Sequence, residues 1–487
     1  MTSRIRLFAA TVLTASLVIS SATPSTATPA VPVAPAPNVG GQWSAVFKLP
    51  LPPAHVALLP NGKILTWFLG GKNTFSYIWD PATNTSITKV VKGVNLMCAG
   101  FVQLSDGRVL VVGGQGTATV TQGLVTTFLF DWRTNTWSHG PTMAARRWYP
   151  SVAALPNGEA LIIGGGPSYP EVFQANGKLR ALTSAFFKHR KRYPFVQVEP
   201  DGKVGYFGHE VQLRSLDPAA KGGWTVFGNR DALQRIYGSY AMFDIGKVLV
   251  AGGGNPGAPP TATAVVVDDV AGTLTPTPTG SLNQARRQGE MTVLADGTVL
   301  YSGGQYGKVE GVDLSKAVRT PELWNPTSGA WTTMAPSIKS RQYHSTALLL
   351  PDGRVFTGGG GDTNVASYSE PNGEIYSPPY LFDGTGALAT RPAITSAPAT
   401  VTAGGTYEVD VTSATGVSKM ALVRLGAETH AVDQGQRYVP LTVTPDTGDK
   451  YQVTVPSSYG AVPQGYYLLF AIDGNGVPSI SAMVQVQ

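Results

Sequence analysis

The nine residues DGRVLVVGG, 106–114, decide the fold, because close variants of them recur along the chain. Most variants begin with a polar or acidic residue followed by Gly, and continue as a short alternating apolar strand that ends in glycine. An Asp-Gly or Asn-Gly pair favours a tight hairpin turn, and the apolar residues after it favour a β-strand. The seven copies begin at Asn61, Asp106, Asn157, Asp201, Ile245, Asp296 and Asp352.

Successive copies are 45, 51, 44, 44, 51 and 56 residues apart. This is the period of a blade of four short strands rather than of a helical repeat. Further strands lie between the copies, and Trp331 closes one blade as in kelch repeats. Seven such blades in a ring form a β-propeller, with the glycine-ended strands expected innermost. A β-sandwich with several glycine-rich hairpins is the alternative, and seven regular copies disfavour it.

The repeat stops near Pro392, and alternating strands follow at the spacing of an immunoglobulin-like sandwich. We therefore predict an all-β protein: a seven-bladed kelch-type β-propeller over residues 41–388, followed by an immunoglobulin-like domain over residues 389–487.

The first residues have the pattern of an export signal. Arg4 and Arg6 precede an apolar run, 7–19, and small residues offer cleavage after Ala22 or Ala27. No run is long enough to span a bilayer. We predict a signal peptide over residues 1–27, an extended Ala/Pro-rich linker over 28–40, and a secreted monomer without a membrane span. Attachment to the cell surface is an alternative location.

Charge points to no polyanionic partner. The chain has 36 Lys plus Arg against 30 Asp plus Glu, so nucleic acid is not expected to bind. One basic run, 188–192, stands out, and a solvated loop is its favoured interpretation over contact with an anionic polymer.

Cys98 is the only cysteine in the chain. An unpaired thiol in an oxidising compartment is a liability unless it is used. Cys98 is therefore either consumed in a covalent or metal-linked structure, or it is a small buried apolar residue.

Reactive residues recur at one position in the repeat, just before the hairpin that contains each copy of the motif. Cys98 stands there in the second copy, Tyr149 in the third, and Tyr343 with His344 in the seventh. A ring of blades brings this position onto a common centre. Neighbouring residues on a regular strand point to opposite faces, so Tyr343 and His344 can share a metal only where the backbone leaves strand geometry. His430 lies between two strands of the C-terminal domain.

Two stretches, RQYHSTALLLPDGRVFTGGGG at 341–361 and THAVDQGQR at 429–437, resemble signatures of the copper radical oxidases, the galactose oxidase and glyoxal oxidase family. The resemblance covers nearly all of the chain after the predicted signal. Because the extra N-terminal carbohydrate-binding domain of galactose oxidase is missing, the chain looks more like a glyoxal oxidase.

The resemblance implies the site. Tyr149 matches the equatorial tyrosine whose ring bonds to the sulfur of Cys98, Tyr343 matches the axial tyrosine, and His344 and His430 match the imidazole ligands. The implied cofactors are one copper ion and a Cys98–Tyr149 thioether that carries a tyrosyl radical. Such a donor set suits tetragonal Cu(II), whereas zinc sites more often have closed Cys and His sets or an acidic ligand.

The implied function is a secreted oxidase that converts a primary alcohol or aldehyde, with a small alcohol, aldehyde or sugar as substrate, and reduces O2 to H2O2. Tyr343 would take the substrate proton, and the Tyr149 radical a hydrogen atom. An extracellular glycan-binding or surface-binding propeller with a vestigial metal site is the alternative, which the joint presence of all five residues disfavours.

Two departures from galactose oxidase argue against galactose as the preferred substrate. Residues 166–169 read Gly-Pro-Ser-Tyr where that enzyme has a tryptophan over the cross-linked tyrosine, so Tyr169 is a candidate cover. Gln288 replaces an aromatic residue that contacts the sugar. Arg230 and Arg235 are candidates for the pocket wall.

Overall fold

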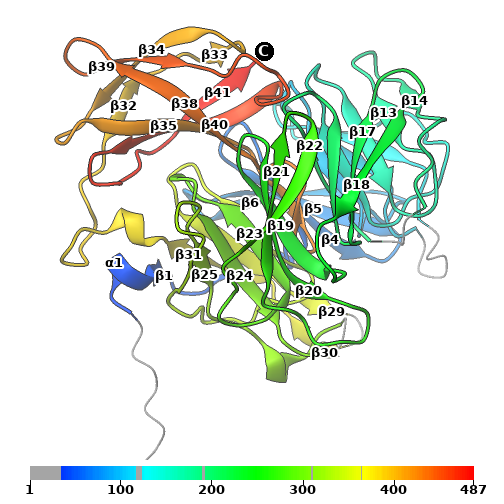
Figure 1. Ribbon diagram of the computed structural model, residues 1–487. Coiled ribbons are helices and arrows are strands. Elements are labelled where there is room, and N and C mark those ends of the chain that lie inside the picture. Colours follow the sequence, from blue (N-terminus) through cyan, green and yellow to red (C-terminus); the bar gives the residue numbers. More distant parts are fainter. Residues whose placement is uncertain (1–34, 117–122, 189–191, 309–310, 363–364) are drawn as a thin grey trace, which may run out of the picture. The chain divides into compact units, whose positions relative to one another are not determined.

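The computed structural model describes residues 35–116, 123–188, 192–308, 311–362 and 365–487 (Figure 1). The predicted signal peptide and most of the predicted linker lie outside these residues. Within them the fold is all-β, as predicted. None of the helices in the described ranges has the length and hydrophobicity needed to cross a membrane.

Seven sheets of antiparallel strands form the seven predicted blades of the propeller. Blades 1 to 3 consist of β3 (His55–Leu58), β4 (Ile64–Gly70), β5 (Asn73–Asp80) and β6 (Thr85–Val91); β7 (Gly100–Gln103), β8 (Val109–Val112), β9 (Thr127–Asp131) and β10 (Thr136–His139); and β11 (Pro150–Ala154), β12 (Ala160–Gly164), β13 (Glu171–Phe173) and β14 (Leu179–Ala181).

Blades 4 to 6 consist of β15 (Phe195–Val198), β16 (Val204–Gly208), β17 (Gln212–Asp217) and β18 (Gly223–Asn229); β19 (Ile236–Asp244), β20 (Lys247–Gly254), β21 (Ala264–Val270) and β22 (Thr273–Thr279); and β23 (Arg287–Val293), β24 (Val299–Gln305), β25 (Glu322–Trp324) and β26 (Trp331–Thr333). A short helix, η1 (Leu314–Lys316), precedes β25.

Blade 7 is built from both ends of the propeller segment. It contains β27 (Ser345–Leu349), β28 (Val355–Gly359) and β31 (Asn372–Ser377), and its outer edge is β1 (Gln42–Trp43) and β2 (Phe47–Lys48), which both pair with β31. The hairpin of β29 (Gly361–Asp362) and β30 (Val365–Ser369) lies between β28 and β31 in sequence. This pairing of N-terminal strands with the last blade closes the ring.

The innermost strand of each blade is the one before the Asp-Gly turn, not the glycine-ended strand after it. Contacts between neighbouring blades link β7, β11, β15, β19, β23, β27 and β3 in this order around the axis, and the glycine-ended strands are second from it. The expectation that the glycine-ended strands lie innermost is therefore wrong. As a result, four of the residues predicted to form the site, Cys98, Tyr149, Tyr343 and His344, lie just before strands that surround the axis.

Buried ion pairs fix the start of three inner strands. Each pair joins an arginine that lies one to four residues before the inner strand to a glutamate on the third strand of the same blade. The three pairs are Arg147–Glu171 at 2.9 Å, Arg286–Glu322 at 2.5 Å and Arg341–Glu374 at 3.0 Å. Breaking a buried pair by removing one partner is costly, about 3–5 kcal/mol, so these pairs hold the segments that carry Tyr149 and Tyr343.

The C-terminal strands form the predicted sandwich, coloured orange to red in Figure 1. Its strands pair in the order β32 (Ala393–Ser396), β34 (Thr406–Thr412), β39 (Lys450–Thr454), β38 (Tyr438–Pro445), β35 (Val417–Arg424), β40 (Gly465–Asp473), β41 (Ala482–Val486) and β33 (Thr400–Val401). The predicted domain boundary after residue 388 falls between β31 and β32, beyond the short helix η2 (Pro379–Leu381), and stays a prediction.

One hairpin of this domain enters the propeller. Its strands β36 (Ala427–Thr429) and β37 (Val432–Asp433) pair with each other, and β36 also pairs with β3, the inner strand of blade 1. The hairpin further contacts the inner strands β7, β19, β23 and β27. It therefore lies on the propeller axis.

The end of the predicted linker differs from an extended tether. Helix α1 (Pro37–Gly40) is followed directly by β1, and Gly40 is buried. The Tyr376 hydroxyl and the Ala335 backbone N–H both donate hydrogen bonds to the Gly40 carbonyl oxygen, at 2.8 Å. These contacts tie residues 37–40 to blades 6 and 7.

Candidate metal centre

All five residues predicted for the site meet at one end of the propeller axis. The hydroxyl oxygens of Tyr149 and Tyr343 are 2.5 Å apart, and the rings of His344 and His430 have their centroids 4.6 Å apart. The Cys98 sulfur is 3.8 Å from Nε2 of His430. Potential ligand atoms of Cys98, His344 and His430 all lie within 4.8 Å of one another. The propeller supplies four of these residues and the axial hairpin supplies the fifth.

The backbone is left-handed at four of these five positions. Cys98, Tyr149, His344 and His430 have φ of 61°, 63°, 65° and 50°, in the left-handed region, which costs an L-residue about 1–2 kcal/mol. The rings of Tyr343 and His344 consequently lie 3.9 Å apart, centroid to centroid, instead of on opposite faces. This is the departure that sequence reasoning required for two neighbours to share a metal.

The hydrogen bond of His344 fixes its tautomer. Nδ1 of His344 lies 2.6 Å from the Gly361 carbonyl oxygen. Because a carbonyl only accepts hydrogen bonds, Nδ1 carries the proton and Nε2 keeps its lone pair. Nε2 is buried and has no hydrogen-bond partner among the described residues. An orphaned, buried lone pair of this kind fits a metal ligand.

His430 is oriented in the same way through Thr429. The Thr429 hydroxyl donates to the Ala54 carbonyl oxygen at 2.7 Å. Its oxygen is therefore left to accept a hydrogen bond from Nδ1 of His430, 2.6 Å away. Nε2 of His430 again keeps the lone pair, and this is the atom that faces the Cys98 sulfur.

The protonation states suit a cation at this place. Burial lowers the pKa of His344 to about 4 and holds the pKa of His430 well below its usual value, so both imidazoles are neutral at pH 7. Burial also raises the pKa of Tyr149 and Tyr343 well above 10. A bound cation would reverse this and favour phenolate. Two imidazole nitrogens and two phenol oxygens are donors that Cu(II) accepts.

Copper-free protein should lose stability as the pH falls from about 6.5 to about 4. The folded pKa of His344 is about 4 and its ordinary value is 6.5. Between these two pH values the unfolded chain binds more protons than the folded chain, so the folded state becomes less stable as the pH is lowered. Thermal midpoints at pH 7, 5.5 and 4 measure this. His344→Asn should flatten the dependence, whereas replacing the exposed His139 by Asn should not. Equal slopes for both variants would contradict the assignment.

Cys98 and Tyr149 are neighbours in space. The Tyr149 backbone N–H donates to the Cys98 carbonyl oxygen at 3.0 Å, and a hydrogen bond between the two side chains affects the pKa of both. Burial raises the pKa of the Cys98 thiol to about 12, so the uncoordinated thiol is protonated.

His55, which sequence analysis did not select, positions Cys98. Its Nε2 accepts the Cys98 backbone N–H at 3.1 Å, and its ring stacks on Trp67 at 4.7 Å. The His55 side chain is fully buried. This hydrogen bond supports the left-handed backbone that turns Cys98 toward Tyr149. No sequence motif links His55 to Cys98, because the contact joins blades 1 and 2.

Trp148, not Tyr169, covers the Tyr149 ring. The two neighbouring rings lie 4.8 Å apart at an angle of 36°, and Tyr193 approaches the same ring edge-on at 5.1 Å. Tyr169 is 44% exposed and packs against Phe186. A tryptophan directly beside Tyr149 was visible in the sequence, but the left-handed backbone that stacks adjacent rings was not.

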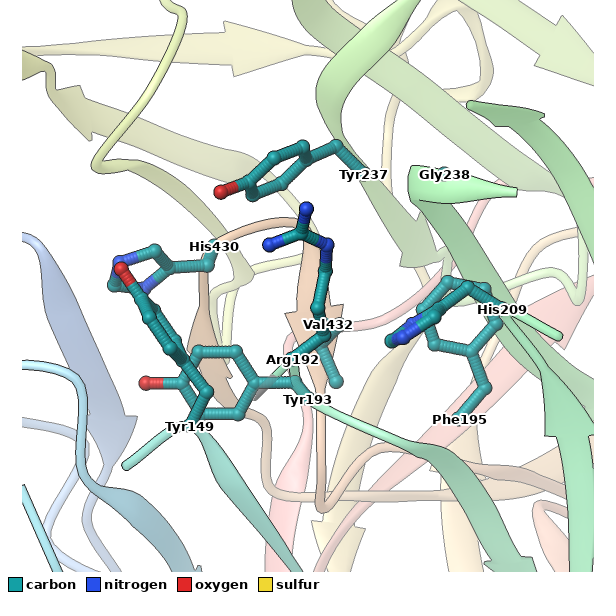
Figure 2. Close-up of a pocket in the computed structure, with 9 residues that line it drawn as sticks. All are labelled: Tyr149, Arg192, Tyr193, Phe195, His209, Tyr237, Gly238, His430 and Val432. Atoms are coloured by element: carbon teal, nitrogen blue, oxygen red, sulfur yellow. The ribbon is translucent and has the colours of Figure 1, made fainter. Parts of the chain in front are cut away.

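A small cavity opens beside Tyr149 and His430 (Figure 2). Arg230 and Arg235 do not line it, since both bind Asp231, at 3.1 and 2.7 Å. Arg192 lines it instead, so the interpretation of the basic run as a solvated loop is wrong for this residue. Lys188 is exposed, and residues 189–191 of that run lie outside the described ranges.

Gln288 takes the same left-handed conformation as the site residues, with φ of 62°. It is buried, and its side-chain amide donates to the Gly311 carbonyl oxygen at 2.9 Å. Gln288 thus occupies the equivalent position of blade 6, directly beside the start of β23.

Known proteins match this chain over nearly its whole length. Galactose oxidase of Gibberella zeae is 31% identical, covering 93% of this chain and 71% of its own. Aldehyde oxidase GLOX of Vitis pseudoreticulata is 29% identical, covering 70% of this chain and 72% of its own. Residues 391–486 match the family described as galactose oxidase-like, Early set domain.

A solved structure of a fungal alcohol oxidase of the AA5 family, in complex with copper, superposes with a TM-score of 0.84 and 27% identity, covering 92% of this chain and 99% of its own. Fold, donor set and matches together define the class as a copper-dependent oxidase built on a β-propeller. The chain belongs to the copper radical oxidase family, together with galactose oxidase and the glyoxal oxidase-like aldehyde oxidases.

Proposed function

We propose that the protein is a secreted copper radical oxidase that oxidises a primary alcohol or the hydrate of an aldehyde and reduces O2 to H2O2. The observation that carries the proposal is the convergence of Tyr149 and Tyr343, 2.5 Å apart at their oxygens, with two imidazoles whose Nε2 lone pairs are free of protons. Secretion is proposed from the signal-like residues 1–27.

Four side chains would hold a single copper ion: Tyr149, Tyr343, His344 and His430. When bound, copper would polarise the substrate oxygen and take up one of the two electrons. Oxidation of an alcohol removes two electrons, so the protein must itself store the second oxidising equivalent.

Tyr149 and Cys98 would supply that store as a thioether-linked pair. Sulfur bonded to the ring donates electron density, so the ring is oxidised more easily than an ordinary tyrosine. The Tyr149 radical takes a hydrogen atom from the substrate carbon, and the Tyr343 oxygen takes the hydroxyl proton. O2 then receives two electrons and two protons and leaves as H2O2.

The surroundings of Tyr149 support this role. Trp148 covers one face of the ring, and Tyr193 closes its edge. The cover limits access of water and reductants to an oxidised ring. The buried Gln288, where galactose oxidase has an aromatic residue, supports a substrate other than galactose.

His344→Ala and His430→Ala should each lose most of the bound copper, because each substitution removes one of the four proposed protein ligands and the ion is then held by fewer bonds. Metal analysis of purified protein measures this, with about one copper per wild-type chain expected. His139→Ala, at an exposed histidine, is the matched control.

Oxygen consumption by the copper-loaded full chain tests the activity itself. A panel of small aldehydes, primary alcohols and sugars should yield H2O2 with at least one class. Full copper occupancy in both histidine variants would refute the ligand assignment, and no O2 uptake with the whole panel would refute the oxidase.

A further inference from the structure

The cavity beside the metal centre contains a fixed positive charge. Tyr149 and His430 line it on the side of the centre, His209 lies on the opposite side, and the Arg192 guanidinium lies between them, next to Tyr237 (Figure 2). None of the nine described residues that line it is acidic. A guanidinium stays protonated across the physiological pH range, so the cavity presents a cation to whatever enters it.

Arg192 is held at a defined place by Tyr237. Its guanidinium carbon lies 5.2 Å from the centroid of the Tyr237 ring. The Tyr237 ring in turn meets Tyr343 edge-on, with centroids 5.8 Å apart. Only one aromatic ring therefore separates the guanidinium from the residue proposed to take the substrate proton.

Tyr237 belongs to the ring of site positions. Its φ is 55°, and it stands beside the start of β19, where Cys98, Tyr149 and His344 stand in blades 2, 3 and 7. A strained, left-handed tyrosine persists only where surrounding structure holds it. The fold thus directs this ring, and the arginine packed on it, toward the common centre.

We propose that Arg192 binds a carboxylate of the substrate, so that the preferred substrates are small aldehydes and primary alcohols that carry a carboxylate near the reacting carbon. This inference rests on the proposed oxidase function and names its substrate class. The planar guanidinium donates two parallel hydrogen bonds that match a carboxylate. Phe195, Val432 and Tyr193 make the remaining wall largely apolar and aromatic, which strengthens such a charged contact.

The reaction balances without a further reagent. With glyoxylate, the hydrated aldehyde carbon gives up two hydrogens, that is two electrons and two protons, and becomes a second carboxyl group. O2 receives both and leaves as H2O2. The carboxylate held by Arg192 is unchanged, and water supplies the oxygen atom that the hydrate contains.

The test compares glyoxylate with methyl glyoxylate, which has the same aldehyde but no charge. Arg192→Gln in the copper-loaded full chain should lower the ratio of kcat/KM for glyoxylate to that for the ester by about 10- to 100-fold, the range of a hydrogen bond to a charged group. Arg319→Gln, at an exposed arginine outside the cavity, should leave the ratio at the wild-type value.

If Arg192→Gln does not fold, Arg192→Lys must show a smaller fall in the same ratio, because it keeps the charge but lacks the two-pronged donor. A ratio within about twofold of wild type in the folded variant would overturn the inference, because a change of this size is what a substitution at an unrelated site gives. So would oxidation of other aldehydes or alcohols but of neither glyoxylate nor its ester. Failure of every substrate would instead overturn the proposed oxidase function.

Discussion

Replacing Tyr343 by phenylalanine is expected to lower turnover by about 100-fold or more, the usual effect of a lost general base, while copper still binds. The substitution keeps the ring, which packs 3.9 Å from His344, and removes only the oxygen that lies 2.5 Å from that of Tyr149. Peroxide production by copper-loaded protein measures turnover, and metal analysis measures occupancy.

The matched control is Tyr169→Phe, which removes an exposed phenol in the blade that carries Tyr149. It should retain wild-type turnover. If Tyr343→Phe also retains it, another group accepts the substrate proton and the proposed division of labour between the two tyrosines is wrong.

Replacing Cys98 by serine should abolish most of the activity and lower the thermal midpoint, again with copper bound. A Cys98–Tyr149 thioether closes a loop of about fifty residues between blades 2 and 3, and by analogy with a disulfide such a loop stabilises by about 4 kcal/mol. Serine cannot form the bond, so both the stored oxidising equivalent and this constraint on the unfolded chain disappear.

Mass spectrometry gives an independent measure of the bond. Formation of the thioether removes two hydrogens, so wild-type protein treated with copper and oxygen should be about 2 Da lighter than protein kept free of metal. After denaturation its Cys98 should resist alkylation. A free, alkylatable thiol in fully active enzyme would refute the radical cofactor.

The blade count could be predicted from sequence because the turn chemistry is local. An Asp-Gly pair followed by apolar alternation, as at Asp106, specifies a hairpin wherever it occurs. Which strand of that hairpin faces the axis is not local, since it depends on packing against the neighbouring blade. For this reason the sequence pattern does not reveal that the strand before the turn, and not the glycine-ended strand, lies innermost.

The convergence of the five candidate residues could be predicted because they share one register position or lie in two long motifs. The residues around them could not. His55 reaches Cys98 from another blade, and Arg192 reaches Tyr237 across blades 4 and 5. These contacts join residues of unrelated local sequence, and they follow from the closure of the ring rather than from any pattern along the chain. The sequence also offers Arg230 and Arg235 as arginines for the pocket wall, but both form ion pairs with Asp231 and do not line the cavity.

The pairing of β1 and β2 with β31, and of β36 with β3, also sets the order in which the protein can be assembled. Both pairings join segments separated by more than three hundred residues, so they form late in a chain made from its N-terminus, after the intervening blades. His430 arrives with the second of them. A chain in which this pairing has not formed therefore lacks one of the two imidazoles, so the metal site is complete only once the polypeptide around it is folded.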